Sequence, residues 1–333
     1  MSVLHLSIGV ILLVTTVVDL LWTTLWVEGG AGPLTKRVMR WTWKLIRRIG
    51  VRWSRVRTLA GPVILLIGIL MWVTFLWTGW TLVFAGAESA LRDTIDGGPI
   101  SWVERVYFVG YTMFTMGNGD FVPRDGVWQL ATAATTASGM LFVTLIITYV
   151  LSVLDAVTQK RSFATDVSGL GLQGETVVRA SWDGEAFTGL DLLLNTFSSE
   201  LNELTANHKA YPILHYFYTE QREAAAVLSV AVLNDALTLW QFGVPAENRP
   251  SRALLENTRS ALQTYLETVG ESFVTQSETT PPAPDLAHLR EAGVPTASDE
   301  EFDNSLDELT AQRRMLLGLV EADARRWPGS QEG

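Results

Sequence analysis

Three long apolar stretches lie in the first half of the chain. No charged residue occurs in Thr58–Ala87 or in Gly126–Leu154. Each of these runs exceeds the ~20 residues that a helix needs to cross the core of a bilayer. A third stretch, Val3–Trp26, is interrupted only by His5 and Asp19. The pattern predicts three membrane-spanning helices, over residues 1–28, 58–87 and 126–155.

The first stretch has two alternatives, a cleaved signal peptide and a helix that lies on the membrane surface. It has no basic leading region, its apolar run is long, and its flanking positive charge comes after it. These features favour a retained membrane helix. Within it, Asp19 could reach the membrane interface or pair with a neighbouring helix.

The segment between the first two spans, residues 34–57, is strongly basic. It carries nine of the twelve Lys and Arg residues found in positions 1–155. Their spacing places almost all of them on one side of a helix, opposite apolar residues. This predicts an amphipathic helix on the membrane surface, with a plain basic loop or a voltage sensor as alternatives. The residues expected to contact anionic lipid are Arg40, Lys44, Arg47 and Arg48.

The distribution of charge predicts the topology. The positive-inside rule assigns the basic segment to the cytoplasmic side, so the N-terminus and the segment between the second and third spans lie outside. The region after residue 155 is then cytoplasmic. It carries 13 Lys and Arg against 26 Asp and Glu, whereas residues 1–155 carry 12 against 9. So acidic a region argues against a nucleic-acid partner.

The segment between the second and third spans, residues 101–123, has the layout of a pore loop. Ser101 and Glu104 form a capping box, which predicts a helix that runs to about Phe114. Then follows Thr115-Met116-Gly117-Asn118-Gly119-Asp120, in which two glycines one residue apart allow successive carbonyls to point the same way. Rings of such carbonyls, one strand from each subunit, can replace the water shell of a cation.

This hexapeptide resembles the Thr-Val-Gly-Tyr-Gly-Asp signature of the potassium channel family. Met116 stands for the usual Val or Ile, and Asn118 for the usual aromatic residue. The resemblance covers residues 59–155 and implies a two-span pore module with an added N-terminal span. Because each chain has one pore loop, it also implies a homotetramer. The implied selectivity filter, which would bind K⁺, consists of Thr115, Met116, Gly117, Asn118 and Gly119.

The resemblance also suggests roles for residues around the filter. Asp120 would stand at its outer mouth. Gly139, which lies 24 residues after Thr115, would be a gating hinge in the inner helix, with close helix packing as the alternative. Below it, one helical face would line an apolar cavity, with the residues Val143, Ile147 and Leu151. An aromatic layer around the filter would come from Tyr107, Phe108, Tyr111 and Phe114.

The expected function is therefore passive conduction of a cation, with potassium favoured. A non-selective sodium/potassium relative carries an acid at the position of Asn118, so a non-selective channel is one alternative. A membrane-anchored helical interaction protein with a vestigial pore loop is another, and a transporter subunit is a third.

The second half of the chain has a different pattern. Gln159–Glu175 is polar and rich in glycine, which predicts a linker over residues 156–188. Residues 189–333 have apolar positions at spacings of three and four, which predicts a helical cytoplasmic domain. The expected helices cover Leu190–Thr205, Tyr211–Trp240, Ser251–Phe273 and Asp299–Arg326. Gly169–Gly174 has the spacing GxGxxG, but it follows a polar run, and Glu175–Val178 is expected to be a strand, so no dinucleotide site is predicted.

No enzyme and no cofactor are expected, apart from K⁺ in the filter. His208 and His215 have no acidic or cysteine partners at metal-ligand spacing, and no nucleophile with a paired base stands out. The cytoplasmic domain could take an intracellular ligand, whose class the residues do not indicate. The predicted fold is an all-α membrane protein, with a tetrameric pore-loop module and a mainly helical cytoplasmic domain.

Overall fold

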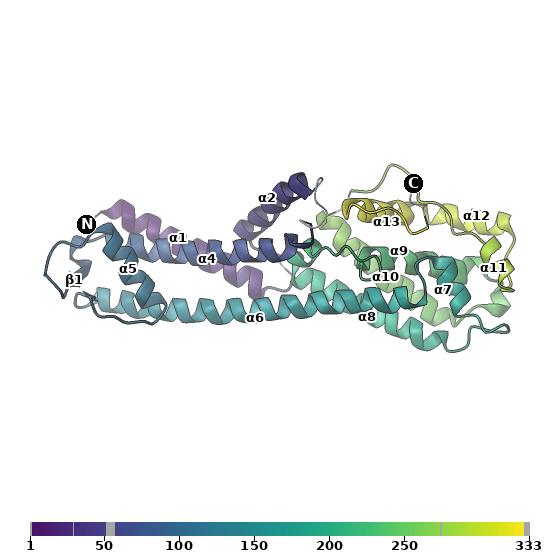
Figure 1. The fold of residues 1–333 in the computed structure, drawn as a ribbon, viewed down its shortest axis with the longest axis horizontal. Helices are drawn as coiled ribbons and strands as arrows, with labels where there is room; N and C mark the ends of the chain where they lie inside the picture. Colours follow the sequence, from purple (N-terminus) through teal and green to yellow (C-terminus); the bar gives the residue numbers. More distant parts are fainter. Residues whose placement is uncertain (1, 29, 51–56, 274, 330–333) are drawn as a thin grey trace. The chain divides into compact units, whose positions relative to one another are not determined.

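A computed structural model describes residues 2–28, 30–50, 57–273 and 275–329, without the side chains at 47, 49–50 and 271–273. The chain is an all-α membrane protein with two short strands among these residues. It divides into two compact units (Figure 1). One is made of residues 1–48 and 61–153, and the other of residues 49–60 and 154–333.

The first unit contains the predicted membrane spans. Three of its helices are long and apolar enough to cross a membrane: α1 (Val3–Leu25), α4 (Ala60–Ala85) and α6 (Val127–Leu170). Around them lie α2 (Pro33–Gly50), the 3₁₀ turn η1 (Glu88–Ala90), β1 (Leu91–Asp93), α5 (Trp102–Met113) and β2 (Phe121–Pro123).

Small residues let α1 and α4 pack closely, and the two helices lie side by side in Figure 1. A Cβ atom added at Gly9 of α1 would lie 2.8 Å from the carbonyl oxygen of Gly79 of α4. One added at Gly79 would lie 2.8 Å from the side chain of Leu13. Glycines at a crossing allow backbones to approach in this way in membrane proteins.

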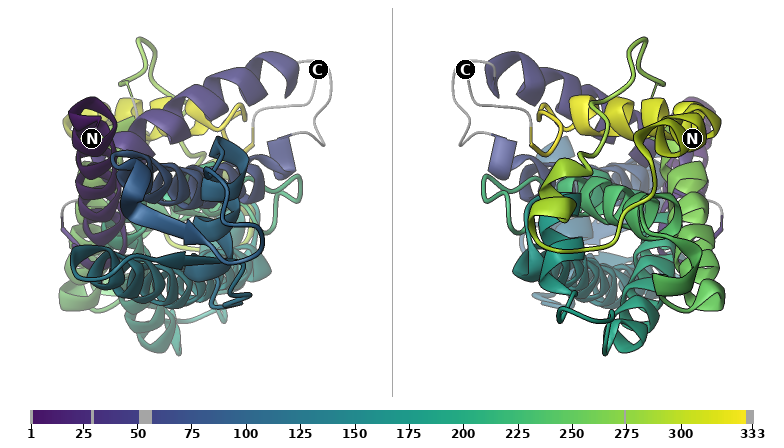
Figure 2. Two further views of the ribbon diagram at one scale, coloured as in Figure 1. Left: turned by 90° about the vertical axis from the view of Figure 1, so that its left-hand side faces the viewer. Right: turned by 90° about the vertical axis from the view of Figure 1, so that its right-hand side faces the viewer.

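An aromatic cluster holds the short helix α5 against the long helices. Phe84 of α4 and Phe108 and Tyr111 of α5 form its buried centre. The indole nitrogen of Trp77 donates to the carbonyl of Val106, at 2.8 Å. These contacts fix the position of α5 next to the end of the unit that carries β1. The left view of Figure 2 looks onto this end.

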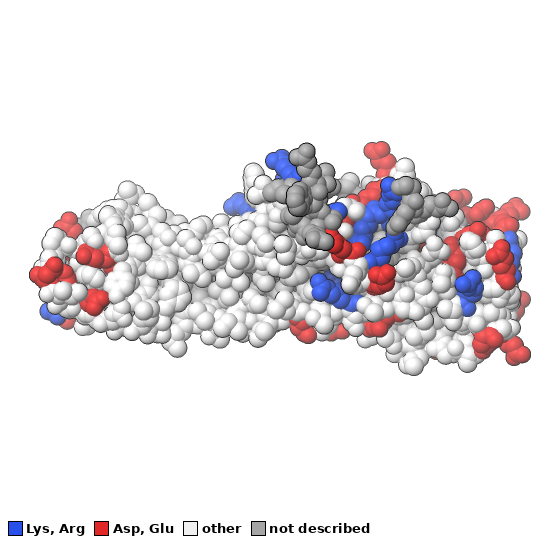
Figure 3. Space-filling model, viewed as in Figure 1, with Lys and Arg blue, Asp and Glu red and all other residues white. Residues whose placement is uncertain are grey.

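Charged side chains of the first unit gather on the basic helix α2 and near the loops at the β1 end. Figure 3 shows an uncharged flank over the long helices, while acidic and basic groups surround the β1 end. An uncharged flank of this kind suits contact with lipid, where an ionised side chain is costly.

The second unit is a helical domain built around α9 (Ala226–Thr238), in which every residue is buried. Together with η3 (Leu239–Gly243), α9 is also long and apolar enough to cross a membrane. However, 89% of its apolar window is buried within the protein, against 22% for α1 and 33% for α4 and for α6. It is therefore the core of this domain. The other elements are α7 (Gly174–Ala180), α8 (Leu190–Ala210), η2 (Pro212–Tyr216), η4 (Ala246–Asn248), α10 (Arg252–Phe273), α11 (Ala287–Glu291), α12 (Asp299–Glu308) and α13 (Thr310–Ala322).

The linker predicted over residues 156–188 is not found. The helix α6 does not end near residue 155 but continues to Leu170, and α7 follows at Gly174. Phe163, Ala164 and Val167 belong to the buried core of the helical domain. These apolar residues recur at helical spacing, but their neighbours are polar. The polar composition of the segment therefore concealed its helical periodicity.

Three smaller differences concern helix boundaries. Glu175–Val178, expected as a strand, belongs to the helix α7. The helix expected over residues 211–240 is not continuous. The 3₁₀ turn η2 and a loop come first, and α9 begins only at Ala226. The helix expected over 299–326 divides into α12 and α13.

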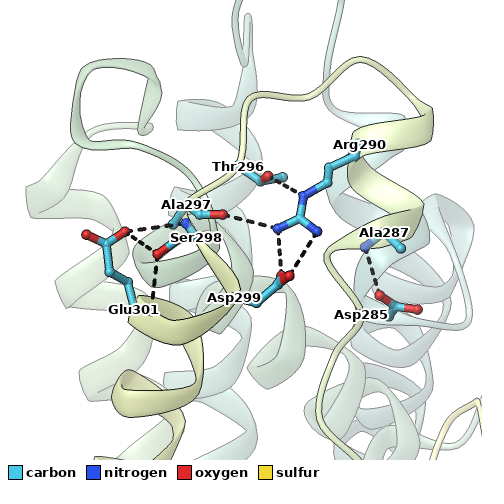
Figure 4. A network of polar contacts seen from close by, with 8 residues as sticks. All are labelled: Asp285, Ala287, Arg290, Thr296, Ala297, Ser298, Asp299 and Glu301. Atoms are coloured by element: carbon cyan, nitrogen blue, oxygen red, sulfur yellow. Dashed lines mark hydrogen bonds and ion pairs between the residues drawn. The ribbon is translucent and has the colours of Figure 1, made fainter.

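A polar network fixes the connection between α11 and α12 (Figure 4). The guanidinium of Arg290 donates to Asp299 at 2.6 Å and to the hydroxyl of Thr296 at 2.9 Å. Ser298 and Glu301 form a capping box that begins α12. The network holds a short exposed connection in one conformation.

A buried ion pair ties α9 to α13. A guanidinium nitrogen of Arg313 lies 2.7 Å from Oδ1 of Asp235, and both side chains are almost fully buried. The indole nitrogen of Trp327 donates to the other carboxylate oxygen at 3.1 Å. Burial raises the pKa of Asp235 to about 6, although Arg313 and Trp327 favour its charged form.

Two histidines of the same domain, the buried His208 and the half-buried His215, have lowered pKa values. His208 of α8 packs edge-on against Tyr265 of α10, and its Nδ1 lies 2.8 Å from the carbonyl oxygen of Leu204. Burial, followed by the nearby charge of Lys160, lowers the pKa of His208 to about 3. The same causes lower the pKa of His215 to about 3. Both rings are therefore neutral in the folded protein near neutral pH.

We expect Asp235→Asn to destabilise the helical domain by about 3–5 kcal/mol, because it leaves the buried guanidinium of Arg313 without a counter-charge. The thermal unfolding midpoint of the purified full-length protein, followed by tryptophan fluorescence, would fall. The control is Glu256→Gln, which breaks an exposed ion pair with Arg252 and should change stability by less than about 1 kcal/mol. Equal midpoints for both variants would contradict a structural role for the buried pair.

We expect His208 and His215 to make the helical domain less stable as the pH falls below 6.5. Asp235, whose pKa the fold raises to about 6, opposes this trend below pH 6. The unfolded chain binds a proton at His208 near pH 6.5, whereas the folded chain binds it only near pH 3. The contribution of each histidine to the unfolding free energy therefore decreases as the pH falls between these values, by up to about 1.4 kcal/mol per pH unit. His208→Phe should reduce the slope of the unfolding midpoint between pH 7 and 5. His288→Phe, at an exposed position, should leave the slope unchanged.

Candidate functional site

The segment from Thr115 to Asp120, here called the signature loop, follows directly after α5. The predicted capping box begins this helix. The hydroxyl of Ser101 accepts from the backbone nitrogen of Glu104, and the Glu104 carboxylate accepts from the backbone nitrogen of Ser101 at 2.6 Å. The carbonyl end of α5, which carries partial negative charge, is where the loop starts.

Backbone nitrogens of the signature loop bond back to the last turn of α5. The nitrogen of Thr115 donates to the carbonyl of Thr112 at 3.1 Å, and that of Met116 donates to Tyr111 at 2.7 Å. Gly117 also donates to Tyr111, at 3.4 Å. In a trans peptide the C=O points opposite to the N–H. The carbonyls of residues 114, 115 and 116 therefore point away from α5.

The loop backbone alternates in conformation. Thr115 has φ +59°, Gly117 has φ +59° and Gly119 has φ +85°, whereas Met116 and Asn118 have negative φ. Alternation of this kind turns successive peptide groups to one side. A threonine in the left-handed region is strained, and strain of this kind clusters at functional sites. Among the residues that the structure describes, no hydrogen bond reaches the carbonyl oxygens of residues 115–118.

The hydroxyl of Tyr107, on α5, joins the two outer residues of the loop. It accepts from the side-chain amide of Asn118 and donates to a carboxylate oxygen of Asp120 at 3.0 Å. The Asn118 side chain thus points back to α5, and Asp120 takes part in holding the loop. The rings of Tyr107 and Tyr111 meet edge to face, with centroids 5.0 Å apart.

The outer end of the loop is held from two sides. The hydroxyl of Tyr111 accepts from the nitrogen of Phe121 at 3.1 Å and donates to its carbonyl. The hydroxyl of Thr94 donates to the carbonyls of Gly119 and Asp120, both at 2.8 Å. The antiparallel pairing of β1 with β2 brings these segments together. No local sequence pattern pointed to Thr94, because it lies in an irregular segment 25 residues before its partner Gly119.

Gly139 of α6 lies against the end of α5. A Cβ atom added there would lie 2.1 Å from the carbonyl oxygen of Met113. The structure thus has the close packing that was the alternative to a hinge, and it places Gly139 directly behind the signature loop. A hinge at this glycine remains a prediction.

The residues predicted to line a cavity share one face of α6. Val143, Ile147 and Leu151 are spaced four apart, and 43%, 55% and 62% of their surfaces are exposed. Exposed apolar side chains in a row indicate a surface that another molecule or a bilayer covers.

The basic helix α2 is described up to Gly50, so the rest of the predicted segment to residue 57 is described only at Arg57. Of the four residues expected at lipid, Arg40, Lys44 and Arg48 are exposed, and the side chain of Arg47 lies outside the described residues. Met39 and Ile46 are buried on the other side. The helix is amphipathic, as predicted.

Comparisons with known proteins point to the same region. A protein-family model described as an ion channel matches residues 67–156, which include α5 and the signature loop. The chain is 40% identical over 328 residues to the uncharacterized membrane protein YdjJ of Bacillus subtilis (strain 168). The match spans 98% of this chain and 96% of that protein. No solved structure matches the chain.

We expect Gly139→Ala to destabilise the first unit by about 1–3 kcal/mol, because the added methyl group overlaps the Met113 carbonyl and must push α5 from α6. The thermal unfolding midpoint in mild detergent would fall. Gly68→Ala on α4 is the matched control, since its methyl group meets no atom within 4 Å and alanine favours a helix by ~1 kcal/mol. A midpoint for Gly139→Ala equal to that of Gly68→Ala would contradict the packing.

Proposed function

This chain belongs to the pore-loop ion channel family, and we propose on that premise that it conducts a cation passively, with potassium favoured. Four copies of the chain form the pore, and the signature loop of each copy supplies one strand of the selectivity filter. The role is conduction down an electrochemical gradient and not an enzymatic reaction.

The orientation of the loop carbonyls carries this proposal. The nitrogens of Thr115, Met116 and Gly117 are bonded to α5, so the carbonyls on the other side of these peptides are turned away from it. Within a membrane, a backbone carbonyl without a partner is costly. A dehydrated cation between four such strands supplies that partner, while the hydroxyl of Thr115 adds a ligand at the inner end.

The number of chains follows from the number of loops. Each chain has one signature loop, and a closed ring of carbonyls around an ion needs several. Rotational symmetry of four copies closes the ring. The exposed face of Val143, Ile147 and Leu151 supports this assembly, since it would line an apolar cavity below the filter, where Gly139 could act as a hinge.

The identity of the ion depends on how firmly the outer loop is held. Asn118 has no aromatic ring, but its amide is bonded to Tyr107, which also holds Asp120. This favours a filter stiff enough to select potassium. A non-selective sodium/potassium channel is the second candidate, because the ring that usually fills position 118 is absent. A vestigial loop is disfavoured, since the supporting bonds are intact.

The orientation in the membrane follows from the basic helix α2. With α2 on the cytoplasmic side, the N-terminus and the signature loop lie outside, and the acidic helical domain is cytoplasmic. The exposed Arg40, Lys44 and Arg48 would contact anionic lipid. Trp41, 74% exposed on the same helix, would lie in the interface. An intracellular ligand of the helical domain is a further expectation.

We expect Gly117→Ala to abolish potassium flux from liposomes. The methyl group meets no atom of its own chain within 4 Å, so the loss comes from φ strain in the ion path and from crowding by the other copies. Gly97→Ala is the matched control, because Gly97 also has a left-handed φ, +70°, and open surroundings. It should conduct normally, and both variants should keep the native mass of four chains.

Unchanged flux in Gly117→Ala would refute the assignment of the ion path. A second measurement, the bi-ionic reversal potential of the parent protein, separates the potassium-selective channel from the non-selective sodium/potassium channel. A reversal potential that strongly favours potassium over sodium supports a selective channel, and one near zero supports the non-selective alternative.

A further inference from the structure

A buried carboxylate joins three helices of the first unit. Asp19, in the C-terminal third of the apolar helix α1, is fully buried. Its oxygens accept from the backbone nitrogens of Leu34 and Thr35, at 2.7 and 3.2 Å, and from the hydroxyl of Thr35 at 2.5 Å. The indole nitrogen of Trp72, on α4, donates to the same carboxylate at 2.9 Å. The sequence left open whether Asp19 reaches the interface or pairs with a neighbouring helix, and the structure shows the pairing.

The contact fixes the beginning of α2. Leu34 and Thr35 are in its first turn, where backbone nitrogens lack partners within the helix, and an acidic group suits the positive end of the helix dipole. The turn before α2 is also close to α1. A Cβ atom at Gly32 would lie 2.4 Å from Asp19 Oδ1, and the Gly32 nitrogen donates to the hydroxyl of Thr23 at 2.9 Å.

The chain of contacts continues to α6. The ring of Trp72 meets the ring of Tyr149 edge to face, with centroids 6.2 Å apart at 71°. Both side chains are buried. Tyr149 lies between Ile147 and Leu151, the exposed pair on the proposed cavity face. A displacement of α2 therefore either breaks hydrogen bonds to a buried carboxylate or moves Trp72, and Trp72 cannot move without repacking Tyr149.

The outer face of α2 supplies the input to this contact. Arg37, Arg40, Lys44 and Arg48 are exposed there, and Met39 and Ile46 are buried within the unit. Anionic lipid attracts juxtamembrane basic residues. A helix with basic residues on its exposed face and apolar residues on its buried face therefore responds to the charge of the membrane surface on which it lies.

We propose that Asp19 is a positioning residue that couples α2, resting on anionic lipid, to the inner helix α6 through Trp72 and Tyr149. Lipid at α2 thereby sets how readily the pore conducts. The proposal rests on the proposed function, because it assigns a regulator to that same pore. Contiguous contacts alone do not establish coupling, so the test measures it.

The first arm compares potassium flux of the full-length protein in vesicles of phosphatidylcholine and in vesicles of phosphatidylcholine with phosphatidylglycerol at three to one. For the parent we expect a several-fold difference between the two lipids. Asp19→Asn and Trp72→Phe should each bring this ratio close to one, and the double variant should add nothing, since both changes break one path. Trp26→Phe is the matched control, because Trp26 is exposed and stacks on Trp22, and it should keep the parental ratio.

The second arm needs no conduction. The chain has no cysteine, so a spin label at Arg37→Cys reports on α2 and one at Arg92→Cys reports on β1. Asp19→Asn should increase the mobility of the label at position 37 and leave the label at position 92 unchanged. Should Asp19→Asn fail to fold, Thr35→Val, which removes one donor to the carboxylate, takes its place in this arm and Trp72→Phe in the other.

The outcomes separate the two proposals. A parental lipid ratio in Asp19→Asn and Trp72→Phe, no lipid dependence in the parent, or an unchanged label at position 37 would each overturn the coupling and leave conduction standing. Absence of flux from the parent in both lipids would refute conduction, and with it the coupling to a pore, while a mobile label would still show that Asp19 holds α2.

Discussion

The need to give every backbone polar group a partner governs the signature loop. Within a membrane that need is met inside the protein, and here the last turn of α5 takes up the nitrogens of the loop. Their carbonyls are thereby turned outward without a partner in the described chain. In the proposed pore the cation is the partner of these carbonyls. Ion binding then satisfies the backbone groups that the hydrogen bonds to α5 leave without a partner. The packing around α5, including Trp77 and Gly139, serves to keep that turn in place.

Much of this arrangement follows from local sequence. Apolar runs predicted the three long helices, and the Ser101–Glu104 pair predicted the start of α5, because hydropathy and capping depend on near neighbours. The partners of Asp19 and Thr94 lie far along the chain, and no local pattern identifies them. An acid inside an apolar run was the only signal for Asp19, and it showed that a partner was needed without showing which.

The extension of α6 shows a different limit of the sequence. Its polar composition after Asp155 indicated a linker, yet Phe163, Ala164 and Val167 are core residues of the helical domain. A helix with one buried stripe and a polar remainder has low average hydropathy, so periodicity is the signal to follow and composition misleads. One helix thus carries both the exposed apolar face at Val143–Leu151 and part of the core of the second unit. In the proposed channel, a ligand of that domain would act on the helix that lines the cavity.

Tyr107 holds the position at which Asn118 stands in place of the usual aromatic residue. One phenol hydroxyl accepts from the Asn118 amide and donates to Asp120, so both outer residues of the loop are held by a single side chain on α5. The supporting ring lies on the helix and not in the loop. Its position there is fixed by its edge-to-face contact with Tyr111, which itself holds Phe121. Rigidity at position 118 therefore comes from a pair of residues, and in the proposed channel the preference for an ion would depend on Tyr107 as much as on the signature.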